Sequence, residues 1–264
     1  MANSVRLFLV DAFAERPFTG NPAAVCLLDS WPDDTWLQSV AMEMNQAETA
    51  FLVREGGAFR LRWFTPAIEV DLCGHATLAS ARVLWDQQLA ETGTPIEFLT
   101  RSGSLFARQI EDQIELDFPL TPQQETAAPA GLLEVLGTTA VYVGKNFDYL
   151  VEVASEAELR ALKPDFRSLA GVECRGVIVT ARSADRQFDF VSRFFAPRAG
   201  IDEDPVTGSA HCTLAHYWGQ KLGKNQMRAF QASRRGGAVS VEIQSDRVLL
   251  RGRAAIVVRG ELIG

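Results

Sequence analysis

A five-residue motif occurs twice in this chain of 264 residues, as RWFTP from residue 62 and as RFFAP from residue 193, an offset of 131 residues. After each copy come acidic residues, a glycine and an apolar segment that ends at a tryptophan, Trp85 or Trp218. The offset is close to half the chain length, whereas solenoids repeat every 20 to 50 residues or so. The sequence therefore predicts two similar halves.

Gly74 and Gly208 stand at the start of the two expected apolar helices. The first backbone N–H groups of a helix have no intrahelical partner, and the helix dipole adds positive charge there. If a pseudo-two-fold axis relates the halves, both helix starts meet at one cleft and bind a small anion, most economically a carboxylate. In the alternative interpretation, each glycine only relieves crowding at a tight turn. The duplication of the whole context favours the binding site.

Composition restricts the classes of partner. The chain is 47% hydrophobic and 22% charged, with a net charge of −7 and no run of Lys or Arg. These values are typical of a soluble globular protein and argue against nucleic acid and anionic membranes as partners. The N-terminal sequence MANSVRLFLVDAF lacks the pattern of an export signal, and no apolar run approaches the roughly 20 residues of a membrane span.

Four widely spaced cysteines lie among apolar or small residues, without a CxxC pair. We expect buried thiols in a reducing cytoplasm. A zinc site is not expected, because His211 and His216 are five residues apart and diverge around the predicted helix.

Short alternating or apolar segments predict strands in both halves. In the first half they span residues 5–10, 23–28, 50–54, 58–64, 96–100, 104–110 and 113–118, and in the second half 139–144, 149–153, 176–180, 187–195, 238–244, 247–251 and 254–258. Apolar helices are expected at 74–88 and 209–222, and a surface helix at 155–162 with a capping box at its start.

The segment 119–131 is rich in Pro, Gln, Thr and Ala, lacks apolar periodicity, and is the expected domain boundary. We therefore expect an N-terminal lobe at 1–118 and a C-terminal lobe at 119–255. The resulting fold class is α+β, with a wall of strands around one apolar helix in each lobe.

Four motifs in the expected order carry a resemblance to a known family: VDAFAERPFTGNPAAV near the start, NQAETAF from residue 45, DLCGHAT from 71 and DEDPVTGSAH from 202. Together they resemble the PhzF (phenazine biosynthesis) family of isomerases, which have the diaminopimelate epimerase fold. The resemblance implies two pseudo-symmetric lobes, each a β-barrel around a central α-helix, with the last strand, at 256–264, completing the N-terminal lobe. It also implies an active site between lobes, a homodimer, and neither organic cofactor nor metal.

The residues and the resemblance together indicate three catalytic candidates. Glu48 is by pattern an exposed strand-end residue, but the resemblance makes it the general acid/base. His75 caps a helix start by default, and the resemblance places it with Gly74 beside the substrate. Asp204 either caps a turn or binds an amino or hydroxyl group of the substrate, which the resemblance supports.

Gly74, Gly208 and Ser209 are the expected substrate-binding residues at the two helix starts. Asn21 is part of an Asn-Pro sequence typical of an ordinary turn and is not included among the site residues.

This sequence differs from diaminopimelate epimerase at one position that matters for the mechanism. Diaminopimelate epimerase has a cysteine before each helix-start glycine, whereas this chain has Cys73 at the first position and Thr207 at the second. A threonine hydroxyl does not act as a base near neutral pH without an activating partner. The sequence therefore favours a proton shift by one carboxylate over exchange between two thiols.

Three functions follow from these observations. The first is a cofactor-independent isomerase that moves a proton along a small carboxylic acid. The second is an amino-acid racemase or epimerase that uses Cys73 against Glu48 or His75. The third is a metabolite-binding protein without turnover.

Overall fold

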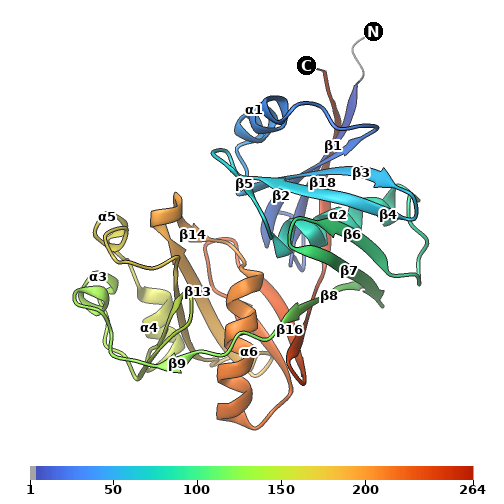
Figure 1. Ribbon diagram of the computed structural model, residues 1–264. Coiled ribbons are helices and arrows are strands. Elements are labelled where there is room, and N and C mark those ends of the chain that lie inside the picture. Colours follow the sequence, from blue (N-terminus) through green and yellow to red (C-terminus); the bar gives the residue numbers. More distant parts are fainter. Residues whose placement is uncertain (1–3, 264) are drawn as a thin grey trace. The chain divides into compact units, whose positions relative to one another are not determined.

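The structure, a computed structural model, describes residues 4–263 and divides into two compact units. One unit comprises Met1–Asp117 with Arg251–Gly264, and the other Phe118–Leu250. Figure 1 shows that each unit has its own strands and helices. The boundaries between the units fall within two strands, β8 (Gln113–Pro119) and β17 (Arg247–Gly252).

The first unit is built mainly of antiparallel strands with parallel pairs where the chain crosses over. Its elements are β1 (Val5–Ala12), β2 (Asn21–Leu28), α1 (Asp34–Met44), β3 (Glu48–Glu55), β4 (Ala58–Phe64), β5 (Glu69–Val70), α2 (Gly74–Asp86), β6 (Ile96–Thr100), β7 (Gly103–Ile110), β8 (Gln113–Pro119) and β18 (Ala254–Leu262). The pairs β2–β3 and β4–β6 are parallel, and β1 pairs antiparallel with both β2 and β18.

Helix α2 is the interior of this unit. Ten of its residues, from His75 to Trp85, are buried, and it packs against β1, β2, β3, β7 and β18. Its polar side chains bond back along the helix, since the Thr77 hydroxyl donates to Cys73 O at 2.6 Å and the Ser80 hydroxyl to Ala76 O at 2.7 Å. These bonds let a helix with little polar surface stay buried on all sides.

The second unit repeats this order of strands. Its elements are β9 (Gln124–Glu125), α3 (Leu132–Leu136), β10 (Tyr142–Lys145), β11 (Tyr149–Glu152), α4 (Glu156–Ala161), α5 (Phe166–Leu169), β12 (Val177–Arg182), β13 (Phe190–Ala196), a 3₁₀ turn (Pro197–Ala199), β14 (Ile201–Asp204), α6 (Gly208–Leu222), β15 (Gln226–Gln231), β16 (Gly237–Gln244) and β17 (Arg247–Gly252). The pairs β11–β12 and β13–β15 are parallel, as are β2–β3 and β4–β6 in the first unit.

Helix α6 is the counterpart of α2. It packs against β15 and β16, and Trp218 near its end is 1% exposed and stacks on Phe190 with ring centroids 5.7 Å apart. The Trp218 indole N–H donates to the Thr180 hydroxyl at 2.9 Å. The buried indole therefore has a hydrogen-bond partner inside the unit.

The repeated motif has the same structural role in both units. Arg62 donates to both carboxylate oxygens of Glu69 at 2.7 Å, which ties β4 to β5. Arg193 does the same to Glu203 at 2.7 and 2.9 Å, which ties β13 to β14. These four side chains are at most 18% exposed. The bidentate pairs fix the strand that leads into each buried helix.

Several elements were not expected from the sequence. Helix α1, the short strands β5, β9 and β14, the helical turns α3 and α5, and strand β15 all lie in segments without a clear period. Helix α1 nevertheless has a local start signal, because the Asp33 carboxylate accepts from the backbone N–H of Trp36 at 2.8 Å. The segment 119–131, expected to be the domain boundary, contains β9.

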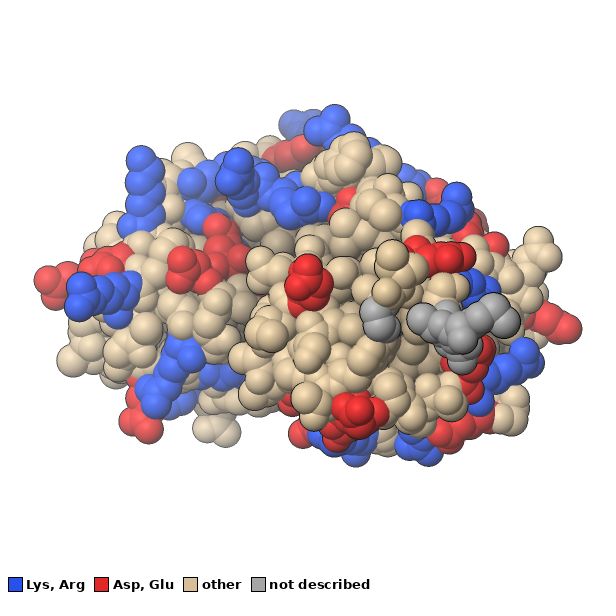
Figure 2. Space-filling model, turned by 90° about the horizontal axis from the view of Figure 1, so that it is seen from above, with Lys and Arg blue, Asp and Glu red and all other residues tan. Residues whose placement is uncertain are grey.

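Acidic and basic side chains are interspersed with uncharged surface on the face drawn in Figure 2. Among residues 4–263, no helix has both the length and the apolar character needed to cross a membrane.

Candidate active site

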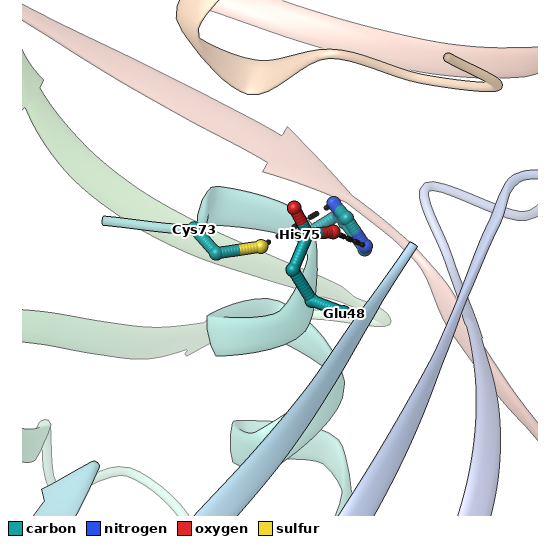
Figure 3. Close-up of side chains that lie close together, drawn as sticks. All are labelled: Glu48, Cys73 and His75. Atoms are coloured by element: carbon teal, nitrogen blue, oxygen red, sulfur yellow. Dashed lines mark hydrogen bonds and ion pairs between the residues drawn. The ribbon is translucent and has the colours of Figure 1, made fainter. Parts of the chain in front are cut away.

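Glu48, Cys73 and His75 come together in the first unit, where β3 and α2 both begin (Figure 3). The Glu48 carboxylate Oε2 lies 3.2 Å from His75 Nε2. Cys73, the residue before Gly74, has its Sγ 3.6 Å from His75 Nδ1. The imidazole is therefore held between a thiol and a carboxylate.

Asn21 determines which nitrogen of His75 carries the proton. Its amide Nδ2 donates to His75 Nδ1 at 3.2 Å, although 54 residues separate the two along the chain. Since Nδ1 accepts this hydrogen bond, the proton of the neutral ring is on Nε2, which faces Glu48. Asn21 is 0% exposed and is the first residue of β2. It is a site residue that the Asn-Pro turn pattern did not reveal.

Burial keeps His75 neutral. His75 is 6% exposed, and removal from water lowers the pKa of its side chain to about 3. Water stabilises the imidazolium form, so a desolvated ring holds a second proton poorly. At neutral pH His75 is consequently not a cation, and its Nε2 lies 3.2 Å from the Glu48 carboxylate without the geometry of a hydrogen bond.

The ligand atoms of Glu48, Cys73 and His75 lie within 4.8 Å of one another, which is a metal-like spacing. However, Cys73 faces Nδ1 and Glu48 faces Nε2. A metal ion bound to Nδ1 would have Glu48 on the far side of the ring, and an ion bound to Nε2 would have Cys73 there. The arrangement fits a hydrogen-bonded relay better than coordination of one ion by all three groups.

In the second unit, Asp204 and Thr207 lie at the start of α6. Asp204 is 8% exposed and its Oδ2 accepts from the Thr207 hydroxyl at 2.5 Å. Gln231, on β15, accepts from the backbone N–H of Thr207 at 2.9 Å and donates to the carbonyl of Asp204 at 2.7 Å. Thr207 is the N-cap residue, and its hydroxyl is directed to Asp204 instead of to the helix N–H groups.

The predicted site residues fall into two groups. Glu48, Gly74 and His75 meet in the first unit, and Asp204, Gly208 and Ser209 lie along one turn of chain at the start of α6 in the second. The Ser209 hydroxyl accepts from the guanidinium of Arg175 at 3.0 Å. Arg175 has no recognisable sequence motif around it.

The fold has relatives among solved structures of epimerising enzymes. A crystal structure of a probable proline racemase from Agrobacterium radiobacter K84 superposes with a TM-score of 0.67 at 10% identity, over 98% of this chain and 92% of that one. This similarity concerns the fold alone. It confirms the expected α+β class of the diaminopimelate epimerase type.

The family follows from sequence and structure together. The profile of the phenazine biosynthesis-like proteins matches residues 10–260, and the chain belongs to that family. An uncharacterized isomerase of Halalkalibacterium halodurans is 51% identical over 259 residues, which are 97% of this chain and 98% of that protein. A crystal structure of a PhzF family protein of Enterococcus faecalis superposes with a TM-score of 0.94 at 40% identity, over 98% of this chain and 99% of that one.

These relatives confirm the enzyme class expected from the sequence, an isomerase.

Proposed function

We propose that this isomerase moves a proton along a small carboxylic acid, with Glu48 as the single general acid/base and without an organic cofactor or metal. The proposed substrate is a cyclic or unsaturated amino or hydroxy acid that the helix-start residues bind. The observation that carries the proposal is the contact of 3.2 Å between the Glu48 carboxylate and His75 at a helix start.

Glu48 has the environment that proton transfer requires. Its side chain is 15% exposed, so a ligand can reach the carboxylate while much of it is shielded from water. Positioned carboxylates of this kind take a proton from one carbon and return it to another. The neighbouring His75 Nε2–H stabilises the carboxylate after it has given up its proton.

The second unit lacks a counterpart of Glu48. Thr49 pairs with Phe64 in β3–β4, and Val177 pairs with Phe195 in β12–β13. Phe64 and Phe195 are equivalent in the repeated motif, so the position equivalent to Glu48 is Gly176. A Cβ at Gly176 would lie 2.3 Å from the Phe194 ring. This asymmetry supports one carboxylate serving both steps of the proton shift.

Gly74, Gly208 and Ser209 are proposed to bind the substrate carboxylate through backbone N–H groups and the serine hydroxyl. Asp204 is proposed to bind the amino or hydroxyl group of the same substrate. The buried position of Asp204, supported by Thr207 and Gln231, suits a fixed hydrogen-bond acceptor.

Exchange of substrate hydrogen with solvent tests this mechanism. A panel of small cyclic and unsaturated amino and hydroxy acids is incubated with the enzyme in heavy water, and deuterium in the recovered acids is measured by mass spectrometry. We expect exchange with the wild type and a decrease of about 10² to 10⁴ for Glu48→Gln, which keeps the size but not the titrating group.

The matched control is Glu55→Gln, at the other end of β3, whose partner is Arg60 at 2.7 Å. This variant is expected to exchange at the wild-type rate. Exchange by Glu48→Gln at that rate would remove Glu48 from the mechanism. If the wild type binds an acid from the panel but exchanges no hydrogen, the protein is a binding protein and the proposal is wrong.

A second mechanism also has a specific observation in its favour. Cys73 Sγ lies 3.6 Å from His75 Nδ1 and in the same group as the Glu48 carboxylate, so the thiol could serve as a base once it has lost its proton to solvent. Cys73 would then act as one base of a racemase, with Glu48 as the other. In the second unit, the Thr207 hydroxyl donates a hydrogen bond to Asp204, and a carboxylate is too weak a base to deprotonate it. The two mechanisms differ in whether turnover needs the thiol.

A further inference from the structure

Arg175 lies two residues before β12 and contacts Phe147 and Asp148, just before β11, and Ser209, in the first turn of α6. Its Nε donates to Asp148 Oδ1 at 2.9 Å, and its Nη2 donates both to Asp148 Oδ2 and to the Ser209 hydroxyl, the latter at 3.0 Å. The guanidinium lies over the ring of Phe147, 4.8 Å from its centroid. The Asp148 side chain is 0% exposed whereas that of Arg175 is 47% exposed. A buried anchor therefore orients a cation that ligands can reach.

The first unit has no such pair at the equivalent place. Ala24 pairs with Thr49 in β2–β3, and Tyr149 pairs with Val177 in β11–β12. Thr49 is equivalent to Val177, so their strand partners Ala24 and Tyr149 are also equivalent. The residues just before these partners, Ala23 and Asp148, are therefore equivalent as well. Glu48 is equivalent to Gly176. The preceding residues, Ala47 in the first half and Arg175 in the second, are therefore equivalent.

The two halves thus have different chemistry at adjacent positions just before or at the start of the equivalent strands β3 and β12. The first supplies a carboxylate beside a neutral histidine. The second supplies a cation fixed by a buried carboxylate and in contact with the helix start.

We infer that Arg175 is the residue that makes the second unit select a carboxylate, acting with Ser209 and the first turn of α6. The inference rests on the proposed function, in which Ser209 binds the substrate carboxylate. It adds a charged residue that discriminates an ionised acid from its neutral analogues.

The hydrogen bond to Ser209 explains how Arg175 acts. A serine hydroxyl has one hydrogen and two lone pairs. When Arg175 N–H occupies one lone pair, the hydroxyl hydrogen remains to donate to a carboxylate oxygen. The positive charge strengthens that donation, and the planar guanidinium with five N–H groups can contact a carboxylate while it still holds Asp148.

A purely structural role makes a different prediction. If Arg175 only neutralises the buried Asp148, its loss destabilises the second unit and affects all ligands equally. If it recognises a carboxylate, its loss changes the preference between an acid and the corresponding amide. The ratio of the two affinities separates the roles.

The experiment measures binding of trans-4-hydroxy-L-proline and of its carboxamide at neutral pH by calorimetry, with the full-length protein. The two probes share the ring, the amine and the hydroxyl and differ only in the carboxylate. The wild type is expected to prefer the acid. Arg175→Gln is expected to weaken binding of the acid about 10-fold or more, as for loss of a charge-assisted hydrogen bond, with the amide unchanged.

Three further variants complete the test. Arg175→Lys keeps the positive charge but not the planar guanidinium with its several N–H donors, and is expected to retain part of the preference for the acid over the amide. The double variant Asp148→Asn with Arg175→Gln leaves no buried unpaired charge, so it folds if the single variant does not, and is expected to lack the preference. Arg160→Gln is the matched control. Like Arg175, Arg160 is about half exposed (48%), pairs with a carboxylate, that of Glu156 at 2.7 Å, and lies near an aromatic ring, 5.7 Å from the Phe230 centroid. Unlike Arg175, it belongs to α4 and does not contact Ser209. It is expected to bind like the wild type.

The outcomes distinguish this inference from the proposed function. If the wild type prefers the acid and the variants at Arg175 keep that preference, Arg175 has only a structural role and the inference is wrong. If the wild type does not prefer the acid, the carboxylate site itself is wrong and the inference fails with it.

Discussion

The two buried histidines, His75 in the first unit and His211 in the second, make the stability of the protein sensitive to acid. Burial lowers the pKa of His75 to about 3 and that of His211 to about 4. In the unfolded chain both histidines take up a proton near pH 6.5. The unfolded state therefore binds more protons below this pH, and the free energy of unfolding falls as the pH decreases from about 6.5 toward the folded values.

The magnitude follows from the size of the shifts. Each pH unit between the unfolded and folded pKa is worth about 1.36 kcal/mol per histidine. Between pH 7 and pH 5 each histidine should therefore lower the free energy of unfolding by about 2 kcal/mol, and both together by about 4 kcal/mol. That is a large part of the 5 to 15 kcal/mol or so that stabilises a typical protein.

Urea unfolding of the wild type and of His211→Asn at pH 7, 6 and 5, followed by circular dichroism, measures this effect. The ring of His211 is 0% exposed and its Nδ1 lies 2.8 Å from Thr207 O, which an asparagine amide can also reach. The variant should lose about 2 kcal/mol less than the wild type between pH 7 and pH 5. His216→Gln is the control, because His216 is only partly buried and should change the pH dependence less. An unaltered pH dependence in His211→Asn would refute the reasoning.

Two further predictions concern the first unit. If Glu48 is the sole proton carrier, Cys73→Ala should retain the rate of deuterium exchange within a factor of about 10. A decrease of that rate by several orders of magnitude, with binding intact, would instead support the racemase mechanism. Gly20→Ala should lower the free energy of unfolding by about 3 kcal/mol or more, because Gly20 has φ of +69° and a Cβ there would lie 2.2 Å from Ala12 O. Gly56→Ala is the control: Gly56 has φ of +60° but no atom within 4 Å of the added Cβ, and an equal loss in both variants would contradict the steric explanation.

Local sequence predicted much of the architecture. The helix expected at 74–88 is observed as Gly74–Asp86, and the one expected at 209–222 as Gly208–Leu222. Helix α2 is apolar on nearly all sides, a pattern typical of a buried helix, whereas α6 has exposed polar residues at its C-terminal end. The capping box expected at Ser155 is confirmed at its first bond, because the Ser155 hydroxyl oxygen accepts from the backbone N–H of Glu158 at 3.2 Å.

Other elements could not be predicted from local pattern. Strand β15 alternates between buried and partly exposed residues, and its sequence QMRAFQ has too few apolar residues to indicate a strand. Strand β5 is only two residues long and is fixed by the pair of Arg62 with Glu69. Such elements depend on partners that are distant in sequence or on ion pairs, neither of which leaves a periodic signal.

The site was predictable in part. Glu48 and His75 were identified through motifs, but Asn21 was set aside because Asn-Pro is common in turns. Its contact with His75 exists only because β2 lies beside α2 in the folded unit. Likewise, the sequence around Arg175 contains no sign that the side chain lies between Asp148 and Ser209.

The sequence by itself determined the duplication, since the repeated arginine motif and the two apolar helices require two units with the same order of strands. It also determined the family, through four motifs in order. The tertiary structure alone decided that equivalent positions have different chemistry, Glu48 against Gly176 and Ala47 against Arg175. The physical reason is that hydrophobic periodicity specifies which residues are buried, whereas strand register specifies which polar side chains meet, and register is set by pairing between segments distant in the chain.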